Sequence, residues 1–522
     1  MNVENLGILG SAVTPRFALR LTSTAGDLPQ LEQALLGMTG SNRSRRATLA
    51  TTYYDTAAGR LSRNGIALQV RKQNGRYTQI VDKVEIKGEP LLTRFEWQDV
   101  IDGEHPDLRA PNSSTRLLEA LGDAELCEQF STALHRTSFM LQPDAATEIA
   151  ASIDKGEIRT ADSERTEPIC EVELQLKQGD PAALYGSALR LVEIASLRIE
   201  LRGKAERGWR LLDSTAAKPQ ALHSLPFDLK PDMTVEESLR KIGLGCLTVF
   251  LRNELAALAD VADGVHQMRV AVRRLRSVVG TIKQMLPQEQ HKWVSKELRW
   301  MANILAPARN WDVLSSSLLA PVRSALSDNQ DLIKLCRICE SERQSAHHSA
   351  NAVIGSGQHT ATLIKLLEWF TSCSWRNQPV SQQSALLMAP IGTMAPRLIG
   401  RRYKKAKKAA DRFDELTPQQ RHEFRISIKK LRYTIEFLKD LFDSGQVAEF
   451  VQRLKPLQDD VGYANDVRVA RDLLADLHVS QDAMAVARAA GVVLGWHDRG
   501  LAEHDRKLRK HIRRLRKLSP FW

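Results

Sequence analysis

One pattern occurs twice without gaps, and it limits the C-terminal half of the chain more than any other feature. The two copies are residues 266–276, HQMRVAVRRLR, and residues 422–432, HEFRISIKKLR. At about 100° per residue of an α-helix, the cationic positions of each copy fall within an arc of roughly 80°, and mostly apolar side chains fill the neighbouring arc. Each copy therefore predicts a helix with an apolar stripe for a core and a cationic stripe beside it.

A second pair of matches follows these copies in the same order. The segment LAPARNWDV places Asp312 46 residues after His266, and the segment LQDDVGYANDV places Asp466 44 residues after His422. Two motifs that repeat at nearly the same spacing indicate a duplicated helical unit of about 150 residues. We therefore expect two pseudo-symmetric four-helix bundles rather than a short-repeat solenoid.

The charge of the chain is concentrated in this repeated half. Residues 1–225 hold 27 Lys and Arg against 30 Asp and Glu, whereas the remainder holds 47 against 32. The electrostatic field of such a positively charged region attracts a polyanion. The cationic stripes carry no aromatic side chains, which argues against the stacking that single-stranded nucleic acids use. A nucleic-acid or granule-associated scaffold stays open as a lesser alternative.

These motifs resemble the CHAD family, the conserved-histidine α-helical domains, over about residues 230–522. The resemblance implies a basic channel that binds inorganic polyphosphate. A flexible polyphosphate has no bases to read, so binding would rest on regularly spaced charge and counterion release. We expect the phosphate contacts to come from the repeated stripes and from neighbouring cations, namely His266, Arg269, Arg273, Arg276, Arg309, Arg401, Lys404, Lys408, His422, Arg425, Lys429 and Arg432.

The N-terminal half alternates between short strands and turns. Strand patterns are expected at 16–21, 51–56, 65–71, 77–84, 94–98, 136–141, 148–153, 169–176 and 197–202, and helices at 28–38, 114–134 and 181–195. Many antiparallel strands with charged residues on one alternating face predict a barrel or tunnel with a charged interior. The fold class is therefore α+β: an antiparallel β tunnel with flanking helices, followed by an all-α domain.

Several motifs of this half resemble the CYTH family, the triphosphate tunnel metalloenzymes, over about residues 14–213. They are YDT at 54–56, GIALQVR at 65–71, RFEW at 94–97, IDKG at 153–156, ICEVEL at 169–174 and KAERG at 204–208. The resemblance implies cations that hold triphosphate, here Arg20, Arg71, Arg94, Arg136 and Lys204. It also implies glutamates that hold Mg²⁺ or Mn²⁺, here Glu171 and Glu173, which alternate onto one face of a strand.

The first strand departs from the pattern of this family. The family has Glu-x-Glu-x-Lys at this place, whereas the chain has Arg16, Ala18 and Arg20. Both glutamates are missing, and a cation at position 16 repels a metal. We expect a catalytically impaired tunnel. A divalent-metal-dependent inorganic triphosphatase stays open as the alternative, and ion pairing inside the barrel is the plainer interpretation of the surviving charges.

The remaining features complete the expected organisation. We expect an N-terminal extension at 1–13, the tunnel at 14–213, a proline-containing linker at 214–232 and the helical domain at 233–522. No apolar run reaches the length of a membrane span, and no signal peptide is recognisable. Six cysteines form no disulfide framework, which favours the cytoplasm, with storage granules as one association. The pair Cys336 and Cys339 is interpreted as core-facing on a helix rather than as a zinc site. Oligomeric state stays open.

Overall fold

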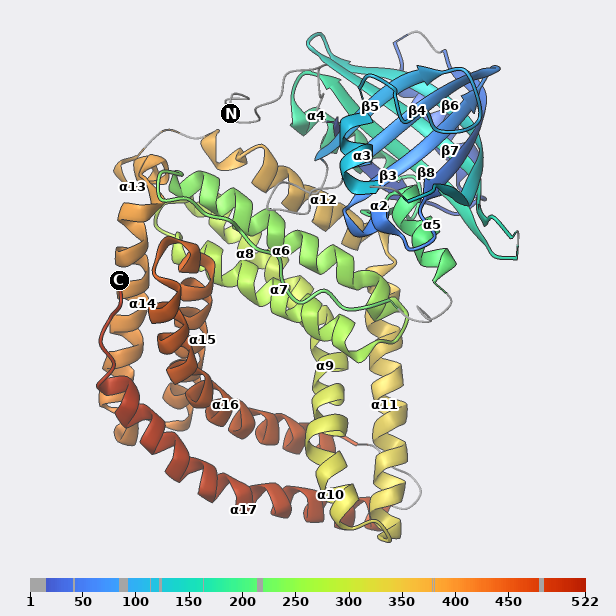
Figure 1. Ribbon diagram of the computed structural model, residues 1–522. Coiled ribbons are helices and arrows are strands. Elements are labelled where there is room, and N and C mark those ends of the chain that lie inside the picture. Colours follow the sequence, from blue (N-terminus) through green and yellow to red (C-terminus); the bar gives the residue numbers. More distant parts are fainter. Residues whose placement is uncertain are drawn as a thin grey trace. The chain divides into compact units, whose positions relative to one another are not determined.

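The structure of the protein is a computed structural model (Figure 1). It describes residues 16–522 except 41–42, 84–92, 113, 122–123, 163, 214–218, 378, 380 and 478–482. The chain divides into two compact units, Met1–Lys218 with Gly355–Ser372, and Pro219–Ile354 with Cys373–Trp522. The first unit carries a β-sheet, and the second is all-helical.

The described strands of the first unit form one antiparallel sheet in the order β5-β4-β3-β2-β6-β7-β8-β1-β9, and β1 also pairs with β5. This last pairing closes the sheet into a tunnel, because β5, at one end of the order, meets β1 near the other end, beside the short β9. The strands are β1 (Arg16–Thr22), β2 (Arg45–Asp55), β3 (Ile66–Gln73), β4 (Arg76–Lys83), β5 (Thr93–Ile101), β6 (Cys127–Asp144), β7 (Thr147–Thr160), β8 (Thr166–Gln178) and β9 (Arg198–Ile199).

Apolar side chains on the outer face of this tunnel are covered by short helices. Phe130 of β6 is fully buried beneath Trp209, and their rings meet edge to face at 5.0 Å. The helices are α1 (Leu28–Met38), α2 (Arg60–Arg63), α3 (Ser114–Leu121), α4 (Pro181–Val192) and α5 (Lys204–Leu212). The inward face is thereby left to the polar and charged side chains, and the predicted α+β tunnel fold is confirmed.

One expected helix is partly wrong. The helix expected at 114–134 ends at Leu121, and β6 begins at Cys127. The residues after 127 alternate, with Phe130, Thr132 and Leu134 buried and their neighbours more exposed. This period of two fits a strand that pairs on one side with β2 and on the other with β7.

A helix from the middle of the C-terminal half belongs to the first unit. Helix α12 (Gly357–Thr371) packs on α4, and its Thr360 hydroxyl donates to the Leu197 carbonyl oxygen at 2.5 Å. The hydroxyl groups of Thr371 and Tyr185 lie 3.1 Å apart. The boundaries expected from the sequence assign 233–522 to one domain, whereas the structure has the chain leave the helical unit after Ile354 and return at Cys373.

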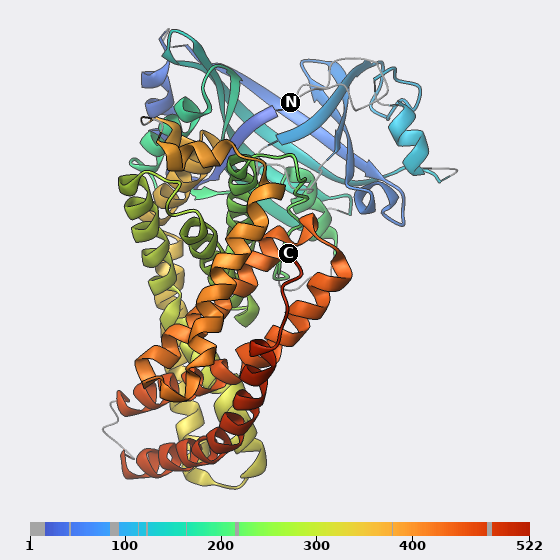
Figure 2. The ribbon, with the colours of Figure 1, turned by 90° about the vertical axis from the view of Figure 1, so that its left-hand side faces the viewer.

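The described helices of the second unit lie along four sides of a frame (Figures 1 and 2). In the first repeat they are α6 (Val235–Leu258), α7 (Ala262–Thr281), α8 (Gln288–Ile304), α9 (Ala306–Val313), η2 (Leu314–Leu319), α10 (Ala320–Ala325) and α11 (Gln330–Ile354). In the second they are α14 (Ile391–Asp411), α15 (Pro418–Leu438), α16 (Ser444–Ala475) and α17 (Ala483–Arg516). Short segments lie between them, namely η3 (Ser374–Arg376), α13 (Gln382–Ala385), η4 (Leu386–Met388), η5 (Phe413–Glu415) and η6 (Lys439–Leu441).

The two repeats share one apolar core. Leu314, Leu332 and Cys339 from the first repeat are buried against Val467 and Val493 from α16 and α17. Cys339 is fully buried, and Cys336 packs at the edge of the same cluster. No group of three or more metal-ligating side chains occurs among the described residues. Within the same residues, no helix combines the length and apolar character of a membrane span.

The expected linker is not a free tether where it is described. Phe227 and Leu229 are buried. The side-chain amide of Asn253 on α6 accepts a hydrogen bond from the backbone N–H of Leu222 and donates one to the Leu222 carbonyl oxygen. Burying an aromatic ring and satisfying both backbone groups hold this segment on the helical unit.

Candidate polyanion sites

Helices α7 and α15 present their apolar stripes to the core. On α7 the side chains of Met268, Val272 and Leu275 are fully buried, and on α15 Phe424 and Leu431 are buried to the same degree. Because the cationic positions lie next to these stripes on each helix, packing holds them at the edge of the core rather than in free solvent. The buried stripes of both copies agree with the pattern predicted from the repeat.

The two repeated helices pack against each other, so their cationic stripes meet. The hydroxyl oxygens of Thr281 on α7 and Thr434 on α15 lie 3.4 Å apart. Arg273 lies close enough to Arg425 and Lys429 for its charge to lower the pKa of both. Arg309 of α9 joins them, because its charge acts on Arg269. We call Arg269, Arg273, Arg309, Arg425 and Lys429 the central cation cluster.

The cations of this cluster have few partners. The Nε atoms of Arg269, Arg273 and Arg425 are buried and have no hydrogen-bond partner among the described residues. Burial, followed by the charges of Arg273 and Arg309, lowers the pKa of Arg269 to about 10. Burial and the charges of Arg425 and Arg273 lower the pKa of Lys429 to about 7. Like charges that are desolvated together are destabilising unless an anion joins them.

The two histidines of the repeat border the cluster. Burial, and then the charges of Arg309 and Arg273, lower the pKa of His266 to about 4. Burial and the charge of Arg425 also lower the pKa of His422. A pKa of about 4 leaves His266 neutral at pH 7, because burial and the neighbouring cations oppose a further charge.

Two aspartates from the second repeated motif provide the counter-charge near the cluster. Asp466 of α16 acts on Arg309, Arg425 and Lys429, and Asp312 of α9 acts on Arg309. One carboxylate oxygen of Asp312 already contacts His347 Nε2 at 2.8 Å, with both side chains buried. The motif aspartates therefore place negative charge near the cluster, where it offsets part of the repulsion among the cations.

The other residues predicted for this site lie outside the cluster. Arg432 pairs with Glu436 at 2.6 Å and donates to Gln458 at 3.0 Å. Arg276 is exposed. The expected positions on α14 are exposed as well, and one of them, Arg401, donates to Gln284; the other two are Lys404 and Lys408.

A further cationic group was missed by sequence reasoning. Lys430 of α15 is half-buried, and its pKa is lowered by burial and by the charges of Arg402, Lys405 and Arg276. Arg299 of α8 lies close enough to Arg276 for the two charges to interact. We call these residues the outer cation group. The run at 401–408 contains both faces of α14. Tertiary contacts select Arg402, which donates to Thr281 of α7, and Lys405, which is exposed but acts on Lys430.

An open cavity of about 690 Å³ lies beside the central cation cluster within the helical unit. His266 and Arg273 line it together with residues 223–227 of the segment that was expected to be a linker. Arg274, next to Arg273, lies 5.3 Å from the Phe227 ring and 5.6 Å from the Phe437 ring. Arg274 also lines this cavity, and these cation–π contacts hold its guanidinium against the two rings.

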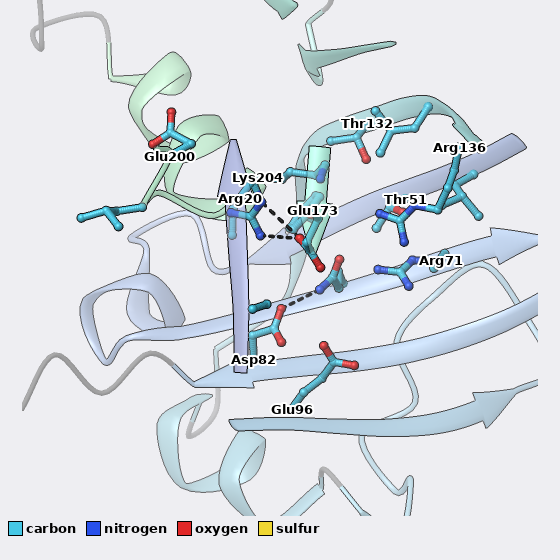
Figure 3. Close-up of a pocket in the computed structure, with 17 residues that line it drawn as sticks. Arg20, Thr51, Arg71, Asp82, Glu96, Thr132, Arg136, Glu173, Glu200 and Lys204 are labelled. Atoms are coloured by element: carbon cyan, nitrogen blue, oxygen red, sulfur yellow. Dashed lines mark hydrogen bonds and ion pairs between the residues drawn. The ribbon is translucent and has the colours of Figure 1, made fainter. Parts of the chain in front are cut away.

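The N-terminal tunnel contains a second charged cavity, of about 120 Å³ (Figure 3). The predicted triphosphate contacts Arg20, Arg71, Arg136 and Lys204 all line it. Glu173 lines it too, whereas Glu171 lies behind the wall with 1 % of its side chain exposed. The side chain of Arg94 lies outside the described residues.

Three of the cations that line the tunnel cavity, Arg20, Arg136 and Lys204, are paired with carboxylates, unlike those of the cluster. Arg136 makes a bidentate contact with Asp154 at 2.6 and 2.7 Å, and Lys204 Nζ reaches the same carboxylate at 2.9 Å. Arg207, which the sequence argument did not select, donates to Glu171 at 2.8 Å. We call Arg20, Arg136, Asp154, Glu171, Glu173, Lys204 and Arg207 the tunnel network.

The pKa shifts of the tunnel network run opposite to those of the cluster. Burial alone lowers the pKa of Arg20 and Arg136, but the attraction of nearby carboxylates outweighs it and raises both. Burial alone raises the pKa of Glu173, yet Arg20 and the other cations bring it down to about 2. Asp154 follows the same rule and its pKa is also lowered. These groups stay charged because they stabilise one another.

The donor set of the tunnel does not fit the divalent metal that the CYTH resemblance implies. The Arg20 guanidinium bridges the two glutamates, with Nε 3.0 Å from Glu171 and Nη2 2.9 Å from Glu173. Lys204 lies 3.3 Å from the same oxygen of Glu171. At an effective dielectric constant near 20, two like unit charges 4 Å apart repel each other by about 4 kcal/mol. A divalent cation beside the positive charges of Arg20 and Lys204 is repelled more strongly.

Comparisons with known proteins agree with this two-part organisation. The CYTH domain model matches residues 19–208, and the CHAD domain model matches residues 241–475. The chain is therefore a CYTH–CHAD protein, with a CYTH domain followed by a CHAD domain.

Individual relatives share limited parts of the chain. An uncharacterized protein of Mycobacterium tuberculosis (strain CDC 1551 / Oshkosh) is 42% identical over 59 residues, which are 11% of this chain and only 12% of that protein. The crystal structure of the CHAD domain from the plant Ricinus communis is 27% identical, with a TM-score of 0.48, and covers 57% of this chain and 96% of its own. A Hippeastrum adenylyl cyclase with a dominant triphosphatase activity is 15% identical, with a TM-score of 0.27, and covers 38% of this chain and 98% of its own.

Proposed function

We propose that the protein binds inorganic polyphosphate through the central cation cluster. The observation that carries this proposal is the set of buried guanidinium nitrogens of Arg269, Arg273 and Arg425 that have no partner among the described residues. A buried donor without a partner costs about 1–3 kcal/mol, and more when it is charged. A ligand that brings phosphate oxygens to these donors recovers this cost.

A linear polyanion fits the cluster better than a single phosphate. The cations come from three helices, with Arg309 on α9, Arg273 on α7 and Arg425 on α15. Arginine offers phosphate two parallel hydrogen bonds, so each guanidinium suits a separate phosphate unit. Phe227 and Tyr433 line the cavity beside Arg273, and both rings are buried, which disfavours base stacking on them.

The competing function is a divalent-metal-dependent triphosphatase in the N-terminal tunnel. The CYTH match favours it. The pairing of Glu171 and Glu173 with Arg20 opposes it, because neither carboxylate is available to a metal without breaking an ion pair. We therefore place ligand binding first and hydrolysis second.

The test is a calorimetric titration of the full chain with long-chain polyphosphate, orthophosphate and a single-stranded oligonucleotide matched in total charge. We expect polyphosphate to bind most tightly and orthophosphate most weakly, because only a polymer reaches several cations at once. Tighter binding of the oligonucleotide, or no binding of polyphosphate, would contradict the proposal.

A further inference from the structure

The N-terminal tunnel differs from a metal site in the way its charges are compensated. Arg20 donates to Glu173 and to the Arg202 carbonyl oxygen, and it also pairs with Glu171. Arg207 occupies the remaining oxygen of Glu171. Each glutamate that would ligate a metal is thus held by a guanidinium supplied by the chain itself.

Arg71 is the exception among the cations that line this cavity. It makes no ion pair with any described residue, and its Nε is buried without a hydrogen-bond partner. Arg71 on β3 pairs with Thr51 on the neighbouring strand β2, and Thr51 and Thr132 both line the cavity. Figure 3 shows Arg71 and Arg136 on the same side of the cavity, with Thr51 next to them.

The size of the cavity limits what binds there. A volume of about 120 Å³ is several times the roughly 10–15 Å³ that a cavity needs to hold one water molecule. That space suits a short oligophosphate and excludes a folded polymer. The hydroxyls of Thr51 and Thr132 and the guanidinium of Arg71 are suitable donors for phosphate oxygens. The carboxylates that line the rest of the cavity include Asp82, Glu96 and Glu200.

We infer that the tunnel is a metal-independent binding site for short oligophosphates, in which Arg20 takes the place of the divalent cation and Arg71 supplies the charge that the ligand neutralises. The ligand binds and is not hydrolysed, because no metal-bound water is generated between Glu171 and Glu173. This inference concerns a different unit from the central cation cluster and does not depend on the function proposed for that cluster.

The test uses the full chain carrying Arg273→Glu and Arg425→Glu, which removes the central cation cluster as a competing site. Inorganic triphosphate is titrated calorimetrically once in EDTA and once in excess Mg²⁺, and phosphate release is followed in both. We expect binding in EDTA to be at least as tight as in Mg²⁺, with no phosphate release above that of buffer. Binding that is tenfold tighter in Mg²⁺, metal-dependent turnover, or no binding in either condition would each overturn the inference.

A second variant identifies the residue responsible. Arg71→Ala in the same background is expected to weaken triphosphate binding at least tenfold while leaving the melting temperature unchanged, since Arg71 supports no ion pair. Arg76→Ala, an exposed arginine on the neighbouring strand β4, is the matched control and is expected to bind as the background does. Equal binding by both variants would remove Arg71 from the site. Titration of the unmodified chain with long-chain polyphosphate reports on the cluster separately.

Discussion

The central cation cluster and the tunnel network use the same residue types in opposite ways. In the cluster, cations from α7, α9 and α15 face one another, and burial and repulsion lower the pKa of Arg269 and Lys429. In the tunnel, carboxylates interleave with the cations, and the pKa values of Arg20 and Arg136 are raised. A count of arginines in the sequence does not distinguish these arrangements.

The difference teaches where binding free energy is available. An arginine that already holds a buried carboxylate must give up that partner before it holds a phosphate, so the net gain is small. An arginine kept among like charges gains on meeting an anion. The cluster therefore has the properties of a ligand site, and the tunnel network has the properties of a structural element. Arg71 lines the same cavity but lies outside that network, and its buried Nε has no partner among the described residues.

The largest expected effect comes from reversing charges in the cluster. Arg273→Glu together with Arg425→Glu removes phosphate contacts that contribute about 1.5–3 kcal/mol each, so polyphosphate affinity should fall at least about 100-fold. Stability should not fall, because two mutually repelling cations are removed. Calorimetry and thermal unfolding of the full chain measure both quantities.

The matched control for this variant reverses two cations elsewhere. Arg513, near the end of α17, and Lys517, in the turn just after it, are both exposed, and substituting both by Glu gives the same change in net charge. Affinity should change by no more than a few-fold, because exposed charges are screened. An equal loss in both variants, or a collapse of helicity in the first, would show that the cluster is not the site.

Removing one cation from the tunnel network should lower the stability of the protein, whereas removing a cation from the cluster should not. Arg20→Ala leaves Glu171 and Glu173 buried with fewer partners, which we expect to cost about 3–5 kcal/mol of the free energy of unfolding of the first unit. Arg425→Ala should leave stability unchanged or higher. Denaturant unfolding followed by circular dichroism compares the two, and equal destabilisation would contradict the distinction between paired and unpaired cations.

Polyphosphate binding should weaken as pH rises above about 7. Lys429 has a pKa of about 7 without ligand, set by burial, by the charges of Arg425, Arg273 and Arg269, and against them by Asp466. A bound polyanion raises this pKa, so binding takes up a proton. The affinity gained from this proton uptake is complete below pH 7. As the pH rises from 7 through the higher pKa of Lys429 in the complex, the affinity falls by at most about tenfold per pH unit.

Two observations separate this effect from general electrostatics. Lys429→Arg should remove most of the pH dependence between 7 and 9, because arginine stays charged. The unliganded chain should also become more stable over this range, since the unfolded state keeps a proton on Lys429 that the folded state has released. A pH profile that Lys429→Arg leaves unaltered would sink this prediction.

The smallest expected effect concerns the face of α14 that extends the site. Arg402→Ala with Lys405→Ala, which lie near Lys430, should weaken polyphosphate binding by a few-fold. Lys404→Ala with Lys408→Ala, on the exposed face, should have less effect than that. The same titration compares the pairs, and the reverse order would show that the exposed face carries the ligand.

Local patterns predicted the parts of this molecule that a single helix or strand determines. The repeat at 266–276 and 422–432 gave both helices, their buried stripes and the cationic face beside each. The alternation of charged residues predicted a closed antiparallel tunnel, because strand periodicity alone assigns the inward face.

The remaining features depend on partners distant in the sequence. Nothing local to Arg20 reveals that Glu173, 153 residues away, will hold its guanidinium. Helix α12 has an amphipathic pattern like those of its neighbours in the sequence, and only the fit of Thr360 and Thr371 against the first unit assigns it there. The pairing that separates a ligand site from a structural network is a tertiary property.

The most direct test of the unpaired cluster is the salt dependence of polyphosphate binding by the full chain. If about four cluster cations each neutralise a phosphate, the logarithm of the affinity should fall linearly with the logarithm of salt concentration, with a slope near −3 by analogy with single strands. The Arg273→Glu and Arg425→Glu variant should show a much shallower slope. A slope near zero for the unmodified chain, or the same steep slope for the variant, would contradict the account.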